Sequence, residues 1–519
     1  MVKNINFKNS TKLFLILLIL VPVFASFLVK TLVWDNPNNK WVIEDLYYKA
    51  KLSDKLTLAP IINQNINSLY EVNDASKLNS ILVSKVATPK SNEDIINEVL
   101  EAKKTNKKIS ISGARHSMGG QVAYKDSIHL DMTKYDKISY ESSDNSVTVE
   151  SGATWKQIQV ELAKQNRAVR VMQDSNIFTV GGSIGSNVHG KDVRYGSLIE
   201  SINWLRIVNA DGIEEKITPA SGLFNYVLGG FGMFGVVTEV NLKTDPDTIY
   251  KYNVANIGIK DFYKKFIDLS NDPKVEQLEA QVSVSNDNLL KDTQVYYFEK
   301  TEEKSSDINR DVSGENSIWL RKLVYRISRE SDLGKNFRWW MQANIGPSLD
   351  PKFVSRNGAM AAPFRTLQLE DEKTTDILQE YFIPIEKSTG FIDFYRETLQ
   401  KNNINIVNCT IRKTNKDTQA VVSYGKSEML GFVCYYKIDK ADTGKQQMQK
   451  LHKEIGKWLV ENQGTFYLTY QNYFEDDVLF KIYPELNKLF VEKTKYDPDE
   501  VFYSQWYENV KNKSDNLQG

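Results

Sequence analysis

The segment ISISGARHSMGG, residues Ile109–Gly120, runs from a pattern typical of a buried strand directly into a loop of small residues. Three glycines in the loop lack a Cβ, so the backbone can turn tightly and approach a ligand closely. Successive backbone N–H groups in such a turn form a concavity that binds anions, and Arg115 adds positive charge beside it. The segment therefore predicts a site suited to a diphosphate. A polar turn with a surface histidine, His116, is an equally strong alternative when the loop is considered alone.

The composition is that of an ordinary globular protein, with 41% hydrophobic and 25% charged residues. The 519 residues are enough for two or three domains with large cores. Lys and Arg (66) balance Asp and Glu (66), so no excess of positive charge indicates nucleic-acid binding. None of the four histidines has metal-ligand spacing with another histidine or a cysteine, so we expect no metal site. Cys409 and Cys434 are too few for a disulfide framework. Export would allow the two to pair, but the count favours two buried free thiols.

The N-terminus carries three lysines followed by an apolar run, Leu13–Val29, interrupted only by one proline and one serine. This pattern is typical of a signal peptide or a membrane anchor, and the weak cleavage site at Val23–Ala25 favours the uncleaved anchor. Positive residues before the run predict a single-pass segment with a cytoplasmic N-terminus and the body of the protein on the non-cytoplasmic side. We expect a membrane anchor within residues 1–35 and a polar connector from 36 to 80.

Helix signals and short strands alternate from Ile81 onward, which predicts an α+β unit. Ser91 and Asp94 form a capping-box-like helix start, and a second helix begins after Thr154. The segment Thr179–Gly190 is predicted to be a second loop rich in glycine and hydroxyl groups, and the two loops together can supply many donors to one large ligand. Strands are expected at Leu82–Ala87, Ile109–Ser112, Ser127–Asp131, Ile138–Glu141, Ser146–Glu150, Ile202–Asn209 and Gly235–Lys243.

The segment Gly230–Gly235 matches the pattern G-x-G-x-x-G but lacks the context of a dinucleotide-binding fingerprint. That fingerprint needs a strand before the glycines and a helix after them. Here a helix-like segment precedes the glycines and the β-rich run Val236–Val240 follows, so a nicotinamide-binding Rossmann domain is not expected.

Three motifs occur in an order that resembles the FAD-binding domain of the vanillyl-alcohol oxidase superfamily, also called the PCMH-type domain. They are Gly113–Gln121, Val180–Gly190 and Gly232–Thr238, and the resemblance covers about Ile81 to Thr244. The motifs are similar to those of the aldonolactone and alditol oxidases and of decaprenylphosphoryl-ribose oxidase, and the triplet His189–Lys191 is most like the last.

The resemblance implies an α+β fold with a two-subdomain PCMH-type FAD-binding domain at 81–244 and an α+β substrate-binding domain at 245–484. A C-terminal segment, 485–519, would return to the FAD domain. It also implies FAD as cofactor, attached covalently to His116, with Arg115 standing where relatives carry glycine. The cofactor-binding residues implied are Ser112, Gly113, Ala114, Arg115, His116, Ser117, Gly181, Gly182, Ser183, Gly185, Ser186, Val236 and Val237.

The substrate half departs from the resemblance at two places. Alditol oxidases have a Glu-x-Arg pair where this chain has Thr410–Arg412, so the arginine is kept and the acid is lost. A lysine of the sugar-oxidising members falls on Tyr470, in a predicted late strand, Gly464–Tyr470. Alternation in that strand would place Tyr470 and Tyr467 on opposite sides.

These features predict an FAD-dependent oxidoreductase that oxidises a CH–OH group of a sugar, polyol, lactone or lipid-linked sugar. The reaction needs a base, for which the candidates are His189 and, if Arg412 lowers its pKa, Tyr470. Oxygen or a quinone would accept the electrons, and the N-terminal segment would make the membrane a partner. The alternatives are a flavin-binding protein without turnover and a flavin reductase that takes hydride from a nicotinamide.

Overall fold

The strand Ile109–Ser112 is present as β5, and the glycine-rich loop begins where β5 ends. We describe the chain from a computed structural model, which covers residues 63–64, 69–303, 308–313, 318–362 and 371–518, all within one compact unit formed by residues 57–519. β5 pairs in parallel with β6 (Ile128–Asp131), which pairs in parallel with β4 (Lys85–Ala87). Parallel strands need a crossover, and α3 (Asn92–Lys104) supplies it between β4 and β5.

Local sequence signals predicted much of the sheet of β4, β5 and β6 and its helix α3. The capping box between Ser91 and Asp94 is present, and Ile95 and Val99 of α3 are buried, whereas Leu100 is exposed. The expected strand Leu82–Ala87 is instead two short strands in different sheets. β3 (Ile81–Val83) joins β2 (Tyr70–Val72) and β1 (Asn63–Gln64) in a three-stranded antiparallel sheet, while β4 joins β6.

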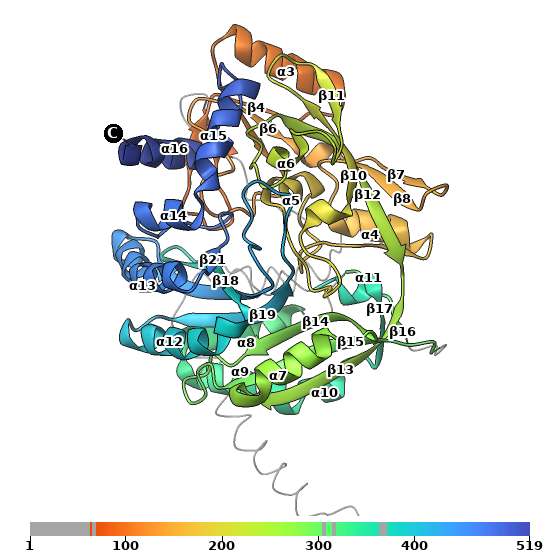
Figure 1. The fold of residues 1–519 in the computed structure, drawn as a ribbon, viewed down its shortest axis with the longest axis vertical. Coiled ribbons are helices and arrows are strands. Elements are labelled where there is room, and N and C mark those ends of the chain that lie inside the picture. Colours follow the sequence, from red (N-terminus) through yellow and green to blue (C-terminus); the bar gives the residue numbers. More distant parts are fainter. Residues whose placement is uncertain (1–62, 65–68, 304–307, 314–317, 363–370, 519) are drawn as a thin grey trace, which may run out of the picture. The chain divides into compact units, whose positions relative to one another are not determined.

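A six-stranded antiparallel sheet forms the other part of the N-terminal half, and Figure 1 shows it above the nine-stranded sheet described next. α4 (Trp155–Ala163) starts at its predicted cap Thr154 and buries Trp155, Ile158 and Leu162. The strands are β7 (Ile138–Glu141), β8 (Ser146–Glu150), β9 (Arg167–Val169), β10 (Ile202–Val208), β11 (Glu214–Ile217) and β12 (Val236–Pro246). The segment Gly230–Gly235 lies between helix α6 (Phe224–Val227) and β12, so the dinucleotide fingerprint is absent there.

The second glycine-rich segment differs from the expectation. We expected Thr179–Gly190 to be a loop, but Val180–Ser186 forms helix α5. Gly181 allows close packing there, because a Cβ on it would lie 2.8 Å from the Cβ of Ser151 and 2.9 Å from the Ser151 oxygen. Tertiary contact overrides the poor helix propensity of glycine. Asn187, at φ 45°, ends the helix in the left-handed conformation.

A nine-stranded sheet forms the core of the C-terminal half, and its two faces are chemically different. Along β19 (Ile406–Thr414), Cys409 and Ile411 face a hydrophobic core, whereas Asn408, Thr410 and Arg412 face a cavity. Helices α7 (Ile259–Ser270), α12 (Ser388–Lys401) and α13 (Asp442–Glu461) pack against strands of this sheet and contribute to that core. The other strands are β13 (Ile249–Gly258), β14 (Val275–Val282), β15 (Asp292–Lys300), β16 (Ile308–Asn309), β17 (Phe353–Ser355), β18 (Thr374–Pro384), β20 (Met429–Asp439) and β21 (Thr465–Phe466).

The late strand is shorter than expected. Only Thr465 and Phe466 pair with β18, and a turn follows from Tyr467 to Tyr470. Strict alternation therefore does not apply, and the rings of Tyr467 and Tyr470 lie 5.5 Å apart on the same cavity instead of on opposite sides. The expectation was wrong because the backbone leaves the sheet after Phe466.

The C-terminal segment packs on the sheet of β4, β5 and β6. The amide of Ile109 donates to the Val501 carbonyl (2.7 Å), and the Tyr503 amide donates to the Ile109 carbonyl (2.8 Å). The remaining helices are α8 (Ile318–Glu330), α9 (Asp332–Asn344), α10 (Gly346–Leu349), α11 (Arg356–Ala359), α14 (Asp476–Ile482), α15 (Glu485–Tyr496) and α16 (Gln505–Gln518). Within the described ranges no helix is long and apolar enough to cross a membrane, and the predicted anchor Leu13–Val29 lies outside them.

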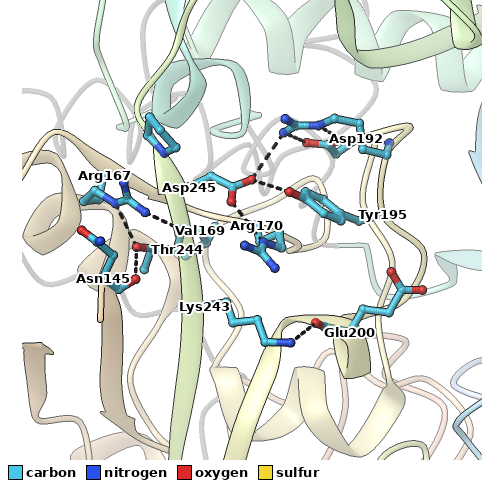
Figure 2. A network of polar contacts seen from close by, with 12 residues as sticks. Asn145, Arg167, Val169, Arg170, Asp192, Tyr195, Glu200, Lys243, Thr244 and Asp245 are labelled. Atoms are coloured by element: carbon cyan, nitrogen blue, oxygen red, sulfur yellow. Dashed lines mark hydrogen bonds and ion pairs between the residues drawn. The ribbon is translucent and has the colours of Figure 1, made fainter. Parts of the chain in front are cut away.

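A buried ion network joins the two halves. Figure 2 shows the carboxylate of Asp245, at the end of β12, with Arg170 (3.1 Å) and the Tyr195 hydroxyl (3.0 Å) against it. The fully buried guanidinium of Arg356, from the C-terminal half, lies 2.7 Å from Asp192. It also donates to the carbonyls of residues 169 (3.1 Å) and 170 (2.7 Å) and to the hydroxyl of residue 250 (3.0 Å).

Replacement of Arg356 by methionine should destabilise the protein by about 3–5 kcal/mol, because buried Asp192 would keep only Arg194 of its two guanidinium partners and the carbonyls of residues 169 and 170 would lose their donor. The free energy of unfolding in denaturant measures this loss. Arg310→Met is the matched control, since Arg310 is more than half exposed and lies 3.5 Å from Asp247, and it should cost about 0–1 kcal/mol. Equal stability of the two variants would contradict a joining role for Arg356.

Candidate functional site

A cavity of about 290 Å³ lies between the two halves and brings the predicted motifs together. One wall is the loop after β5 with the segment around α5, and the other wall is the polar face of the nine-stranded sheet. The lining includes every predicted cofactor-binding residue except Val236. Val236 is buried in a hydrophobic cluster with Ile109 and Val208, while its neighbour Val237 lines the cavity.

The loop after β5 keeps a tight backbone although it contains an arginine. Arg115 has φ 58°, in the left-handed region that favours glycine. Its carbonyl accepts a hydrogen bond from the Ala75 amide (2.9 Å), and its guanidinium lies 3.1 Å from Asp131. The arginine therefore adopts the backbone conformation of a glycine while its side chain is bound to β6. His116 follows on the cavity wall, with its ring 4.7 Å from that of Phe178 in an edge-on arrangement.

Several buried hydroxyl groups on the cavity wall lack a hydrogen-bond partner in the described part of the chain. They belong to Ser151, Ser175, Thr179 and Thr469. Buried polar groups are almost always hydrogen-bonded, so these hydroxyls suit a ligand with many acceptor atoms. The glycine loops, the adjacent hydroxyls and the apolar side chains of Phe178 and Val188 fit a large cofactor with both polar and aromatic parts.

A histidine–carboxylate pair joins the segment after α5 to the sheet wall, and only its histidine was predicted from the sequence. His189 was a candidate base, and its Nε2 lies 2.7 Å from Oε1 of Glu380 on β18. Both side chains are buried, and the other ring nitrogen, Nδ1, has no hydrogen-bond partner among the described residues. Glu380 is 191 positions away in the sequence, and no local pattern marked it as a partner of His189.

Arg412 lies in a compact cluster of two cations and two carboxylates. It is 3.2 Å from Asp174 and 3.5 Å from Glu279, and Lys191 is 3.5 Å and 3.1 Å from the same two groups. Burial alone would raise the pKa of Asp174, but Arg412 and Lys191 outweigh it, so its pKa lies below the usual value. The acid that is missing at position 410 is thus supplied by neighbouring segments.

Tyr470 does not meet the condition set for a base. Burial, followed by the nearby Glu380, raises its pKa well above the usual value, and Arg412 offsets this only in part. Tyr470 is therefore a neutral phenol at physiological pH. Burial also raises the pKa of Tyr435, on the same wall.

The other histidines and both cysteines lie outside the cavity lining. His129 bridges Ser110 and Ser112, each at 2.9 Å, and burial lowers its pKa to about 4. Cys409 and Cys434 are buried free thiols with sulfurs 3.6 Å apart, as expected. The described residues contain no group of three or more His, Cys, Asp or Glu side chains arranged to hold a metal ion.

Comparisons with known proteins agree with this geometry. Residues 83–218 match the family described as "FAD binding domain", and we identify this part of the chain as a PCMH-type FAD-binding domain. L-gulonolactone oxidase of Mus musculus is 28% identical over 29% of this chain and 35% of its own length. L-gulono-1,4-lactone dehydrogenase of Mycobacterium tuberculosis is 26% identical over 31% of this chain and 38% of its own length. The chain thus spans less than half the length of the curated relatives it matches.

A solved structure shows that the likeness in fold extends beyond the FAD-binding part. Cholesterol oxidase from B. sterolicum superposes with a TM-score of 0.67 over 87% of this chain and 99% of that chain, at 14% sequence identity. Both halves therefore have a mixed α+β fold of this kind.

The close approach of the two glycine-rich segments gives a test of the cofactor wall. A Cβ on Gly113 would lie 1.8 Å from Oγ1 and 2.9 Å from Cβ of Thr179, at the start of α5. We expect Gly113→Ala to cost about 1–3 kcal/mol in stability and to lower the ratio of bound flavin to protein. Gly222→Ala, where nothing lies within 4 Å, is the control. Full flavin content in Gly113→Ala would show that this contact does not shape the site.

Proposed function

We propose that the protein is an FAD-dependent oxidoreductase that oxidises a CH–OH group of a sugar, polyol, lactone or lipid-linked sugar. The observation that carries the proposal is that the FAD-binding loops and the His189–Glu380 pair line one cavity. The names of the curated relatives, which include a lactone oxidase and a lactone dehydrogenase, support the donor class. Oxygen and a quinone are the two acceptors to be tested.

FAD would be held by the loop after β5 and by the segment around α5. When bound, it supplies an acceptor for the hydride that leaves the substrate carbon. We propose that His116 attaches it covalently. Two observations support this: His116 lies on the same cavity wall as the glycine loop, and Arg115 before it keeps a left-handed backbone.

His189 takes the proton of the substrate hydroxyl in this proposal. The Glu380 carboxylate accepts the Nε2–H bond, which fixes the tautomer and leaves the lone pair of Nδ1 available. A base so placed makes hydride loss from the same carbon easier, since removal of the proton prevents positive charge from building up on the oxygen as the C=O bond forms. Glu380 acts as a positioning residue and stabilises the positive ring that forms.

The charge cluster at the cavity favours an uncharged polar substrate. The positive charges of Arg412 and Lys191 are balanced by those of Asp174 and Glu279, so the cluster has no net charge to attract an ion. Its many donors and acceptors suit hydroxyl or lactone oxygens instead.

We propose that residues 1–35 anchor the protein in a membrane, with the body on the non-cytoplasmic side. Support comes from the sequence alone, namely the lysines before the apolar run Leu13–Val29.

The covalent bond can be tested on purified protein by running it on a denaturing gel and recording flavin fluorescence in the protein band. We expect a fluorescent band that disappears in His116→Ala. Fluorescence released on denaturation would keep FAD and exclude the covalent bond. No flavin in either fraction, after expression with FAD supplied, would contradict the whole proposal.

The role of the pair can be tested by following flavin reduction without air, with L-gulono-1,4-lactone as the first probe and alditols next. His189→Gln should slow the reaction by about 10²–10⁴-fold because the base is lost. Glu380→Gln should slow it less, since the base remains but loses the carboxylate that orients its ring and stabilises its positive form.

Tyr470→Phe separates the two candidate bases, because it removes only the hydroxyl of a neutral phenol. A loss in Tyr470→Phe as large as that in His189→Gln would contradict the assignment of the base. Reduction by none of the probes would favour a flavin protein without turnover, and rapid reduction by a nicotinamide would favour a flavin reductase.

A further inference from the structure

Helices α8 and α9 are attached to the cavity-facing side of the nine-stranded sheet by polar contacts. On α8, Arg329 donates to Asp376 of β18 (2.6 Å). On α9, Arg338 donates to the carbonyl of Val407 (2.9 Å) and to the side chain of Asn408 (2.7 Å), which lines the cavity. These helices therefore border the wall that carries the proposed substrate site.

The polarity of α9 is the reverse of that of an ordinary surface helix. Its Arg338 and Gln342 point into the protein, where Gln342 donates to Gln281 of β14 (2.9 Å). Two of its large apolar side chains point outward, with Leu333 81% and Trp340 48% exposed. Phe337, Trp339 and Met341 are half-buried. Surface helices normally place their polar residues in water and their apolar residues in the core.

The exposed apolar surface continues from α9 into α10. Phe337 stacks on Trp340 with 6.3 Å between ring centroids, and Ile345 and Leu349 of the next turns are exposed. Leu349, at 78%, and Leu333 are the two most exposed large hydrophobic side chains in the described part of the chain. We call Leu333, Phe337, Trp340, Ile345 and Leu349 the apolar face of α9 and α10, and Figure 1 shows α10 at the lower edge of the coloured ribbon.

Positive charge lies beside this face. Arg321 of α8 and Lys352, three residues after α10, are exposed. Of the acids nearby, Glu330 is paired with Lys437 (2.5 Å), and Asp332 lies in the first turn of α9, where it stabilises the helix. Asp287 accepts a hydrogen bond from Asn336 of α9 (2.6 Å). Asp350, next to Leu349, accepts one from the Tyr252 hydroxyl (3.3 Å) and interacts with Arg321, so Lys352 is the cation of this pair that Asp350 does not offset.

We infer that the apolar face of α9 and α10 docks on the surface of an anionic lipid bilayer. A helix that lies in the membrane interface buries Trp and Leu below the headgroups and holds cations against them, and tryptophan is enriched at that depth. Both faces of α9 then contact groups of matching polarity, because its polar side chains bind the sheet and its exposed apolar side chains lie in lipid. The docking does not depend on the flavin chemistry proposed above.

Docking of this kind brings the wall of the cavity close to the bilayer, since Arg338 binds Asn408 directly. The apolar face lies more than 300 residues after the predicted anchor Leu13–Val29. Membrane contact of the apolar face can therefore be measured while the predicted anchor is left intact.

The test uses the full chain, with an environment-sensitive fluorophore on Leu349→Cys or Leu333→Cys. The native Cys409 and Cys434 are fully buried and are not labelled. The control position is Ile213→Cys, 57% exposed on the N-terminal half. We expect phosphatidylcholine vesicles that contain phosphatidylglycerol to shift the emission of the first two labels to the blue, and spin-labelled lipid to quench it. The label at position 213 should not change.

Charge is tested by the double variant Arg321→Glu and Lys352→Glu, which should weaken the shift on anionic vesicles. A label at position 349 that stays in water on vesicles carrying the bound protein would overturn the inference. So would a blue shift that appears without vesicles and grows with protein concentration, because a second copy of the chain would then be the occupant.

Discussion

The buried guanidinium of Arg356 is the contact on which the site depends, because neither half of the protein has a complete cavity wall alone. Arg356 belongs to the C-terminal half and is bound to the carbonyls of Val169 and Arg170 and to the carboxylate of Asp192. Backbone pairing continues the same joint, since the Val193 amide donates to the Glu276 carbonyl (2.9 Å). The loop that holds the cofactor and the sheet that meets the substrate therefore keep a fixed spacing.

Alternation along the strands then decides what each face can do. In β20, Tyr435 faces the cavity and Tyr436 faces the core, and in β18 the same holds for Glu380 and Tyr381. Helices cover the core face, and the polar groups proposed for catalysis lie on the other face, which borders the cavity. The cost of burying them is met by pairing, as with Glu380 and His189 at 2.7 Å.

Sequence reasoning found the features that short-range rules determine. The cap of α3, the strand β5 and the glycine loop depend on residues a few positions apart, and they were predicted correctly. It missed what depends on distant partners. No local sequence pattern around Glu380 predicts its contact with His189, 191 residues earlier. The sequence around Thr410 likewise does not predict that Glu279 lies beside Arg412. The turn after Phe466 and the helix α5 were mispredicted because packing overrode the local pattern.

Arg115 illustrates how a departure from a motif can leave its geometry intact. A left-handed backbone costs a residue with a Cβ about 1–2 kcal/mol, so a loop that needs φ 58° would favour glycine. Here the side chain is held by Asp131 and the carbonyl by the Ala75 amide, and both contacts exist only in the folded loop. They offset the strain and hold the backbone on either side of the arginine. The two contacts of Arg115 therefore fix the position of His116. A glycine in place of Arg115 would adopt the same backbone conformation without such contacts, because it has no Cβ.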